Sequence, residues 1–184
     1  SEVEKLIEEV RRSSKKVEED LDRSNRELED ILRRVAEELE KSNRELEKIL
    51  KEVAERVKRR EERLVKKIVE EVERKVDEVL KRNRDIIRKV EETVERVLRR
   101  NRKIVDDNRK LLDKVLEDIR RLPVEEEIVK RVEEEARRLK ERSREIVKRS
   151  EDSAREITKA LRKLVRDSED SVRKIKEKLK EETR

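Results

Sequence analysis

The aliphatic residues of this chain fall on one stripe with a helical period. In the first third of the sequence, Val, Leu and Ile follow one another from Val3 to Val57 at a mean step of about 3.6 residues. That step is the period of a straight α-helix, whereas a strict seven-residue repeat would impose a left-handed supercoil. Charged residues fill most of the other positions. The pattern therefore predicts long, straight, amphipathic helices.

Whole segments of the sequence also recur at a fixed interval. SNRELEDILRRVAEELEK (24–41) is followed directly by SNRELEKILKEVAERVKR (42–59). The length of this repeat corresponds to about five turns of an α-helix, so the repeat keeps every layer of an untwisted bundle facing the same way. The same interval separates three more polar pairs: Asn83 and Asn101, Ser150 and Ser168, and Ser153 and Ser171.

Two breaks divide the stripe. The only proline, Pro123, suits the first position of a helix, with Arg120 and Arg121 ending the helix before it and three glutamates, 125–127, in the first turn after it. The other break is expected at 58–63, where cations give way to anions, although KRREER contains no Gly, Pro, Asn or Ser. At the amino terminus, Ser1 and Glu4 predict a capping box.

These breaks predict an all-α fold, a straight antiparallel three-helix bundle whose helices have about 60 residues each. The whole chain, 1–184, is expected to be one domain, with helices over 1–60, 61–122 and 123–184. One alternative stays open at the first break. A continuous helix over 1–122 could not bury both of its halves alone, so the chain would then form a helix-swapped homodimer.

Serine and asparagine positions test this arrangement independently. Residues at one height of an antiparallel helix pair have residue numbers with a constant sum. Ser24 with Asn101 and Ser42 with Asn83 share one sum, which centres a turn near 62. Asn101 with Ser150 and Asn83 with Ser168 share another, which centres a turn near 125. Two polar layers are therefore expected to line up across all three helices.

The polar residues on or beside the stripe have two interpretations. They could be solubilising residues at its edge, or they could form two buried hydrogen-bond networks, because Asn and Ser both donate and accept. Buried amides would penalise shifted pairings of the helices, so such networks serve specificity and not chemistry. The expected network residues are Ser24, Asn25, Ser42, Asn43, Asn83, Asn101, Ser150, Ser153, Ser168 and Ser171. A third layer is expected from Ser13, Ser14, Asn108 and Ser143.

The amino-acid composition argues against several classes of binding partner. The chain has no Gly, Cys, Met, His, Gln, Phe, Trp or Tyr, and 59% of its residues are charged. The net charge of +6 is spread along the chain, with no basic arm and no aromatic ring to stack on a base, which speaks against nucleic-acid binding. No apolar run approaches the roughly 18 residues of a membrane span. We therefore expect a soluble chain with no nucleic-acid, membrane or small-molecule partner.

Catalytic residues are not expected. A nucleophilic serine needs an activating base, and the chain offers neither His, Cys nor Tyr. A metal site would need a cluster of carboxylates, and no carboxylate stands on the inward stripe. No glycine-rich loop is present to hold a phosphate. The sequence predicts no enzymatic activity, no cofactor and no metal.

With its long internal repeat and its Ser/Asn layers, the whole chain resembles de novo designed helical bundles with buried hydrogen-bond networks. Within that group, LKERSREIVKRSEDSAREITKALRKLV (139–165) resembles the latch helices of designed cage-and-latch switches. It departs from that pattern in having fewer helices and no glycine linker before the latch.

The resemblance implies a structural scaffold with no natural biochemical activity, most simply a monomer. Two alternatives remain: an interaction module in which one helix, first of all 124–184, is displaced by a partner helix, and a helix-swapped homo-oligomer. The last third of the chain holds the fewest Val, Ile and Leu, which is why its helix is the first candidate for displacement.

Overall fold

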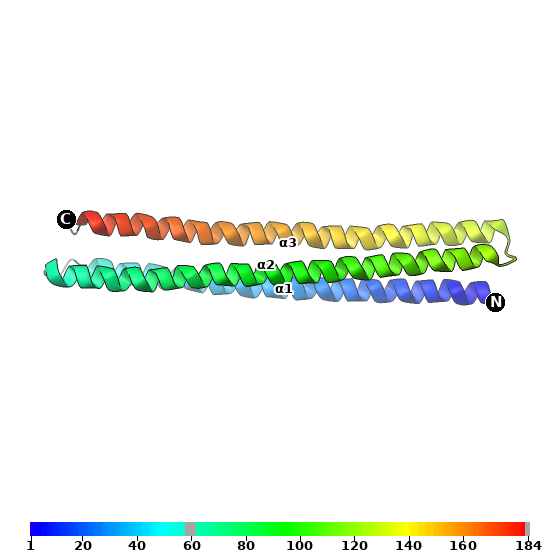
Figure 1. Cartoon of the computed structure of the whole chain (residues 1–184), viewed down its shortest axis with the longest axis horizontal. Coiled ribbons are helices and arrows are strands. Elements are labelled where there is room, and N and C mark those ends of the chain that lie inside the picture. Colours follow the sequence, from blue (N-terminus) through cyan, green and yellow to red (C-terminus); the bar gives the residue numbers. More distant parts are fainter. Residues whose placement is uncertain (58–61, 183–184) are drawn as a thin grey trace. The chain divides into compact units, whose positions relative to one another are not determined.

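The chain forms three long α-helices (Figure 1). The computed structural model describes residues 1–57 and 62–182. Helix α1 runs over Glu2–Val57, α2 over Glu62–Arg121 and α3 over Glu126–Glu182, with 56, 60 and 57 residues. The predicted all-α fold, a three-helix bundle with helices of nearly equal length, is confirmed.

Helix α1 begins as its sequence predicts. The backbone N–H of Glu4 donates to Ser1 Oγ over 3.3 Å, and the N–H of Lys5 donates to the Ser1 carbonyl over 3.2 Å. A carboxylate oxygen of Glu4 lies 3.7 Å from the Ser1 ammonium group. The side chains of Ser1 and Glu4 thus interact with the first turn in both directions, as in a capping box.

The connection between α2 and α3 differs in one detail from the prediction. Pro123 is not the first residue of α3, which begins at Glu126. It lies in the connection, between Leu122 and Val124, whose N–H donates to the Leu122 carbonyl over 2.8 Å. The reversal needs connecting residues outside both helices, and a proline with its fixed φ and missing N–H suits such a position.

Acidic residues do occupy the start of α3. The Glu125 carbonyl accepts from Val129 over 3.3 Å, the first hydrogen bond of the helical pattern, and Glu126 and Glu127 lie in the first turn. Negative charge at this end of the helix interacts favourably with the helix dipole.

The first expected break, at 58–63, falls largely on residues 58–61, which lie outside the described residues. On either side of them, α1 ends at Val57 and α2 begins at Glu62. In unit 1 Arg100 of α2 pairs with Glu27 of α1, and in unit 2 Arg82 of α2 pairs with Glu45 of α1. Within each unit α1 and α2 therefore pack against each other.

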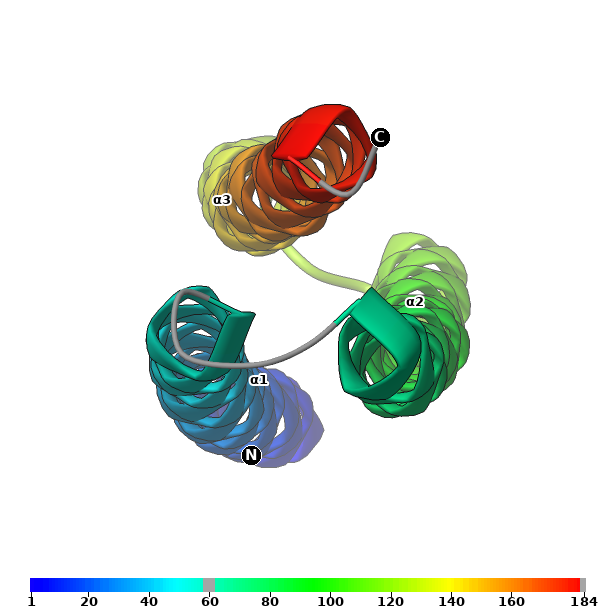
Figure 2. The ribbon, with the colours of Figure 1, turned by 90° about the vertical axis from the view of Figure 1, so that its left-hand side faces the viewer.

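Contacts divide the chain into two compact units, each with a segment of all three helices. Unit 1 comprises Ser1–Glu29 and Thr93–Arg155, and unit 2 comprises Asp30–Glu92 and Glu156–Arg184. Within each unit α1 and α3 run in the same direction and α2 runs against them (Figure 1). In unit 2, nearest the viewer in Figure 2, the three helices surround a common centre.

Each unit has an aliphatic core. Unit 1 contains two buried clusters, one near the α2–α3 connection and a smaller one further along the helices. The first consists of Val10, Leu112, Val115, Leu116, Ile119, Val132 and Ala136, and the second of Val17, Leu21 and Val147. Unit 2 has one larger cluster, of Leu46, Val53, Ile68, Val72, Val76, Val79, Leu80, Val172 and Leu179. At about 1.5–3 kcal/mol for each fully buried aliphatic side chain, these clusters supply the main driving force for folding.

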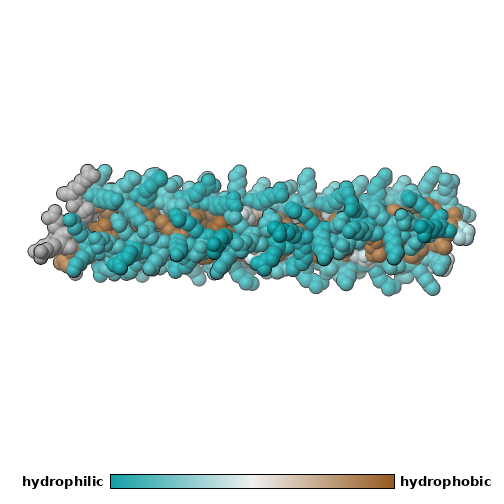
Figure 3. Space-filling view, in the orientation of Figure 1, coloured by the Kyte–Doolittle hydropathy of each residue, from teal (hydrophilic) through white to brown (hydrophobic). Residues whose placement is uncertain are grey.

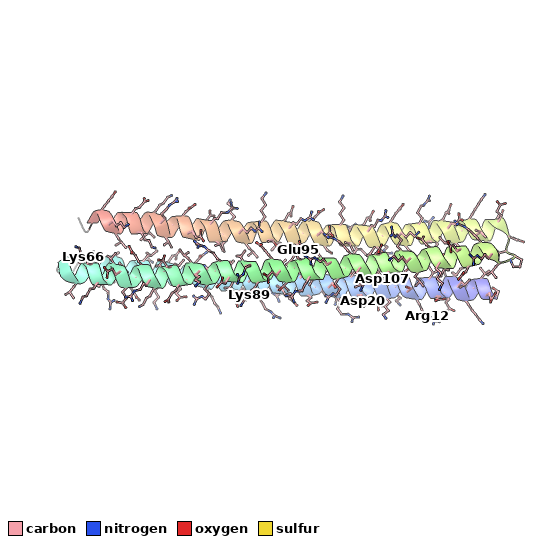
Figure 4. All side chains as sticks on the ribbon, viewed as in Figure 1. Arg12, Asp20, Lys66, Lys89, Glu95 and Asp107 are labelled. Carbon is pink, nitrogen blue, oxygen red and sulfur yellow. The ribbon has the colours of Figure 1, made fainter. Side chains whose placement is uncertain are left out.

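Charged side chains cover the outside of both units. In Figure 3 the visible face is mostly hydrophilic, and apolar side chains show only in patches between the charged ones. Figure 4 shows labelled examples, with Arg12 and Asp20 on α1 and Lys66 and Glu95 on α2. Leu64 is the one large hydrophobic side chain that is exposed among the described residues. This surface fits the interleaved charges of the sequence.

Candidate functional site: the buried serine and asparagine layers

Polar side chains interrupt the core of unit 1 at one height, here called layer A: Ser24, Asn25, Asn101 and Ser150. Ser24, Asn101 and Ser150 are buried, and Asn25 is half-buried. The Ser150 hydroxyl lies within reach of two acceptors, Asn25 Oδ1 on α1 and, at 2.9 Å, the Ile146 carbonyl on its own helix. A hydroxyl has one hydrogen, so Ser150 alternates between or shares these two acceptors. Layer A therefore links α1 and α3 through side chains.

Helix α2 joins layer A through an arginine. Arg100 Nη2 donates to Ser24 Oγ over 3.2 Å and to Glu27 over 3.1 Å, both on α1. On the other side of Asn101, Arg102 pairs with Glu151 of α3. The two arginines on either side of Asn101 thus pair with glutamates that lie close to the layer in sequence, one on α1 and one on α3. This places Asn101 at the height of Ser24 and Ser150.

The side chain of Asn101 makes no hydrogen bond with the described part of the chain. Its exposed fraction is 0%, and both its Nδ2 and its Oδ1 are buried without a partner. A buried polar atom that lacks a partner costs about 1–3 kcal/mol. We predicted that Asn101 would be the side chain of α2 in this network. In layer A it is Arg100 that makes this contact, with Ser24, and Asn101 does not.

Unit 2 contains the same arrangement one sequence repeat away on each helix, here called layer B: Ser42, Asn43, Asn83 and Ser168. The Ser168 hydroxyl lies within reach of Asn43 Oδ1 and, at 2.9 Å, of the Leu164 carbonyl. Asn83, with an exposed fraction of 0%, again has no partner for Nδ2 or Oδ1 among the described residues. The two units therefore repeat the hydrogen bonds of the α3 serine and the same unpaired amide.

The flanking arginines repeat as well. Arg82 donates to Glu45 of α1 over 3.0 Å, and Arg84 donates to Glu169 of α3 over 2.6 Å. The sequence pattern did not predict a role for these arginines. A signal was present, because the tripeptide Arg-Asn-Arg occurs at 82–84 and again at 100–102. We call this element the arginine clamp: an inward asparagine between two arginines that pair with the two neighbouring helices.

The expected third layer lies in unit 1 and is here called layer C: Ser13, Ser14, Asn108 and Ser143. Ser13 Oγ donates to Asn108 Oδ1 over 3.0 Å, and the Ser143 hydroxyl donates to the Leu139 carbonyl over 2.9 Å. Ser14, Asn108 and Ser143 are buried, and Ser14 Oγ has no partner among the described residues. On α1 and α3, layer C falls in sequence between the two aliphatic clusters of unit 1.

The prediction is wrong for two of the expected network residues. Ser153 and Ser171 are exposed and do not belong to the buried layers. The inward positions are taken by the next residues, Ala154 and Val172, which are 2% exposed. Successive helical residues are turned by about 100°, and here Ala154 and Val172 face the core while Ser153 and Ser171 are turned away from it.

A ladder of ion pairs flanks the layers between α2 and α3. The described part of each unit contains three such pairs, and the two residue numbers have the same sum in all six, as expected for one antiparallel register. They are Arg102–Glu151, Arg120–Glu133 and Lys140–Asp113 in unit 1, and Arg84–Glu169, Arg162–Glu91 and Lys176–Asp77 in unit 2. The side chains are partly exposed, so each pair contributes modestly to stability.

The ladder also shifts protonation equilibria. The hydrogen bond from Arg162, reinforced by its charge, lowers the pKa of Glu91 below its ordinary range, against an opposing effect of burial. The hydrogen bonds that Arg84 and Arg102 donate to Glu169 and Glu151 raise the pKa values of these two arginines, which are already high. These shifts arise from structural ion pairs, and none belongs to a group placed beside a nucleophile.

Two shallow grooves lie on the surface. In unit 2, a groove of about 210 Å³ runs between α1 and α3 and includes Asn43, Ser168 and Ser171. In unit 1, a groove of about 250 Å³ between α2 and α3 has Val105 and Val147 among charged side chains, including Arg144 and Lys148. Neither contains a nucleophile with an activating base.

Two other kinds of site have no counterpart in the described residues. In residues 1–57 and 62–182, Asp and Glu side chains form no group of three or more that could hold a metal ion. Over the same residues, no helix combines the length and the apolar character that crossing a membrane requires.

Comparison with known proteins identifies the fold. No family model and no curated protein matches the sequence. A solved structure described as a "Computationally designed three helix bundle" is similar, with a TM-score of 0.72 over 99% of this chain and 90% of that one. The two sequences are 16% identical, so the likeness is one of fold. At that level the resemblance to designed helical bundles is confirmed.

Proposed function

We propose that this chain is a designed structural scaffold without natural biochemical activity. Its aliphatic core drives folding, and its buried Ser/Asn layers with their arginine clamps specify which helix surfaces pair. The alternatives, a displaceable-helix module and a helix-swapped homo-oligomer, each have a distinct experimental outcome.

One observation carries this proposal: the serine–asparagine hydrogen bond of layer A recurs in layer B at the interval of the sequence repeat. Ser150 with Asn25 and Ser168 with Asn43 make the same hydrogen bond, and the arginine clamps around Asn101 and Asn83 repeat with it. Repeated modules built almost entirely from strong helix formers are typical of design, where one solved layer is reused. The designed three-helix bundle of similar fold supports the same interpretation.

The layers would specify the register of the bundle, that is, which residues of neighbouring helices lie at the same height. A slip of one helix by a few residues places buried amides against aliphatic side chains, which leaves their polar atoms without partners. Because layers A and B are separated by one whole repeat, a slip of that same length would still match one of them. Layer C removes this degeneracy, since Asn108 follows Asn101 by seven residues and Ser143 precedes Ser150 by seven.

Mass in solution tests the scaffold proposal most directly. Size exclusion with light scattering should give 22.4 kDa for the full chain at every concentration. The chain then closes on itself, as α1 and α2 do within each unit. A stable mass of twice that value would contradict the monomeric scaffold and favour the helix-swapped homodimer.

A second candidate function, displacement of α3 by a partner helix, rests on how little α3 buries. Among the described residues α3 contributes six buried Val or Leu side chains and two alanines to the core, while α2 contributes fifteen buried Val, Leu or Ile side chains. Since buried aliphatic area dominates the attachment of a helix, α3 is held least tightly.

The two candidates differ in helix exchange. A labelled peptide of residues 124–184 should enter the full-length bundle if α3 is displaceable. A matched peptide carrying Leu161→Asp and Val165→Asp, two positions buried in α3, should then fail to enter. No exchange of the parent peptide over days at room temperature would favour the scaffold.

A further inference from the structure

The two unpaired asparagines pose a chemical question that the scaffold role leaves open. Asn101 in unit 1 and Asn83 in unit 2 each bury a whole side-chain amide, with two N–H donors and one carbonyl, and neither atom has a partner among the described residues. Native structures rarely leave such groups without any partner. Something of matching chemistry should therefore satisfy them.

The neighbouring side chains of layer A still have hydrogen-bonding capacity. Ser24 Oγ accepts from Arg100 and retains its own hydrogen to donate. Ser150 uses its hydrogen toward Asn25 or Ile146 and retains lone pairs that can accept. A small molecule that both donates and accepts would match this set, whereas a cation or an anion would match only part of it.

The same height of the bundle is built from small side chains. Ser24 faces the core between Leu21 and Leu28 on α1, and Ser150 and Ala154 do so on α3. Serine and alanine have smaller side chains than the leucines and valines of neighbouring layers, so less side-chain volume surrounds Asn101 than in a purely aliphatic layer. In layer B, Ser42 and Ser168 take the same places around Asn83. A polar core position with spare volume is where buried water is held in proteins.

We propose that each asparagine layer is a binding site for ordered water. In layer A the water accepts from Asn101 Nδ2 and from the Ser24 hydroxyl, and it donates to Ser150 Oγ. In layer B, Asn83, Ser42 and Ser168 take the corresponding roles. Water then completes the link between all three helices that direct side-chain hydrogen bonds leave open at α2. This inference rests on the proposed role of the layers as specific contacts within the bundle.

A crystal structure of the full chain at a resolution that shows solvent tests the inference. We expect density for water at about 2.7–3.2 Å from an amide atom of Asn101, and likewise for Asn83. Direct hydrogen bonds from both amides to serine hydroxyls or backbone carbonyls, with no solvent in contact, would overturn it.

Nuclear magnetic resonance gives an independent readout in solution. The side-chain amide protons of Asn83 and Asn101 should show nuclear Overhauser effects to water with the sign of a long-lived complex. Asn101→Leu should abolish the effect at layer A and leave Asn83 unchanged, and Asn83→Leu should do the reverse. Each layer thus serves as the control for the other.

The two serines belong to the same site and give a further variant. In the double variant Ser24→Ala and Ser150→Ala the water loses two of its three partners, so the effect at Asn101 should weaken while the effect at Asn83 stays unchanged. An undiminished effect at Asn101 would overturn the site as built from these residues. A dry layer in a chain of 22.4 kDa would overturn only the water site, whereas a doubled mass would overturn the scaffold proposal.

Discussion

Arg84 Nε lies 2.6 Å from a carboxylate oxygen of Glu169 and so connects α2 to α3 beside the buried amide of Asn83. The arginine side chain is 65% exposed and the glutamate 28%. The pair therefore covers the edge of layer B without being buried itself. Its counterpart in unit 1, Arg102 with Glu151, covers layer A in the same way.

This geometry predicts a measurable but small coupling between Arg84 and Glu169. A double-mutant cycle with Arg84→Gln and Glu169→Gln should give a small favourable coupling free energy that declines with added salt. Chemical denaturation of the four proteins measures it. Asp170→Asn in place of Glu169→Gln is the matched control, since Asp170 pairs with Arg173 on its own helix. Equal coupling for both cycles would contradict a specific link across the helices.

The core predicts a much larger effect at Leu98. This side chain is 1% exposed in α2, and Leu98→Asp would bury a charge without a partner. We expect a loss of more than about 4 kcal/mol in the free energy of unfolding, or failure to fold. Leu64→Asp is the control, because Leu64 on the same helix is 44% exposed and should tolerate the change within about 0.5 kcal/mol. Thermal unfolding followed by circular dichroism distinguishes them.

The fold could be predicted from the sequence because every level of the pattern agrees. The apolar stripe has the helical period over the whole length, Pro123 and the charge switch near 60 divide it, and the polar residues fix one antiparallel register. Where the local sequence contains few signals for a helix end, the predicted helix boundary is less accurate. The helical period does not state how many residues a reversal needs, so Pro123 was placed in α3 and not in the connection before it.

The site could be predicted only in part. Residue spacing places Ser150 and Ser168 on the buried face, but it does not resolve neighbours that are about 100° apart, and so Ser153 and Ser171 were included wrongly. Spacing also cannot tell which donor meets which acceptor. That depends on rotamers, and the structure gives the α2 contact in layer A to Arg100 while Asn101 remains unpaired among the described residues.

The unpaired amide predicts that Asn101→Leu stabilises the folded state. Leucine removes a buried amide without a direct protein partner and adds apolar volume, so the free energy of unfolding should rise by about 1–3 kcal/mol. Equilibrium denaturation measures the change. The cost should appear as weaker specification of the helix register, read as a broader mixture of species in size exclusion.

The control for this variant is Asn25→Leu. Asn25 lies in the same layer but is half-buried and accepts from Ser150, so its replacement removes a hydrogen bond and leaves a serine with one acceptor fewer. We expect no gain in stability there. A large drop in melting temperature for Asn101→Leu would mean that its amide is fully satisfied by the protein and would contradict the layer geometry.

The lowered pKa of Glu91 predicts an acid dependence of stability. Because the hydrogen bond from Arg162 holds the folded-state pKa below the ordinary value near 4.5, the carboxylate favours the folded state above that pH. The contribution should be lost as the pH falls through the folded-state pKa, where protonation favours the unfolded chain. The chain contains many other carboxylates, so the variant Glu91→Gln is needed to isolate the contribution of Glu91.

At pH 7, Glu91→Gln should lower the free energy of unfolding by about 0.2–1 kcal/mol, since the pair is partly exposed. The difference between the variant and the parent chain should shrink as the pH falls through the folded-state pKa of Glu91, because the parent carboxyl is then protonated and has lost its ion pair. Glu92→Gln changes the neighbouring, exposed residue and should leave stability unchanged at neutral and at acidic pH. Chemical denaturation at neutral and at acidic pH distinguishes the possible causes. A difference between Glu91→Gln and the parent chain that persists at acidic pH would assign the effect of Glu91 to packing. Equal effects of Glu91→Gln and Glu92→Gln at pH 7 would show that the contact with Arg162 adds nothing to an ordinary surface charge.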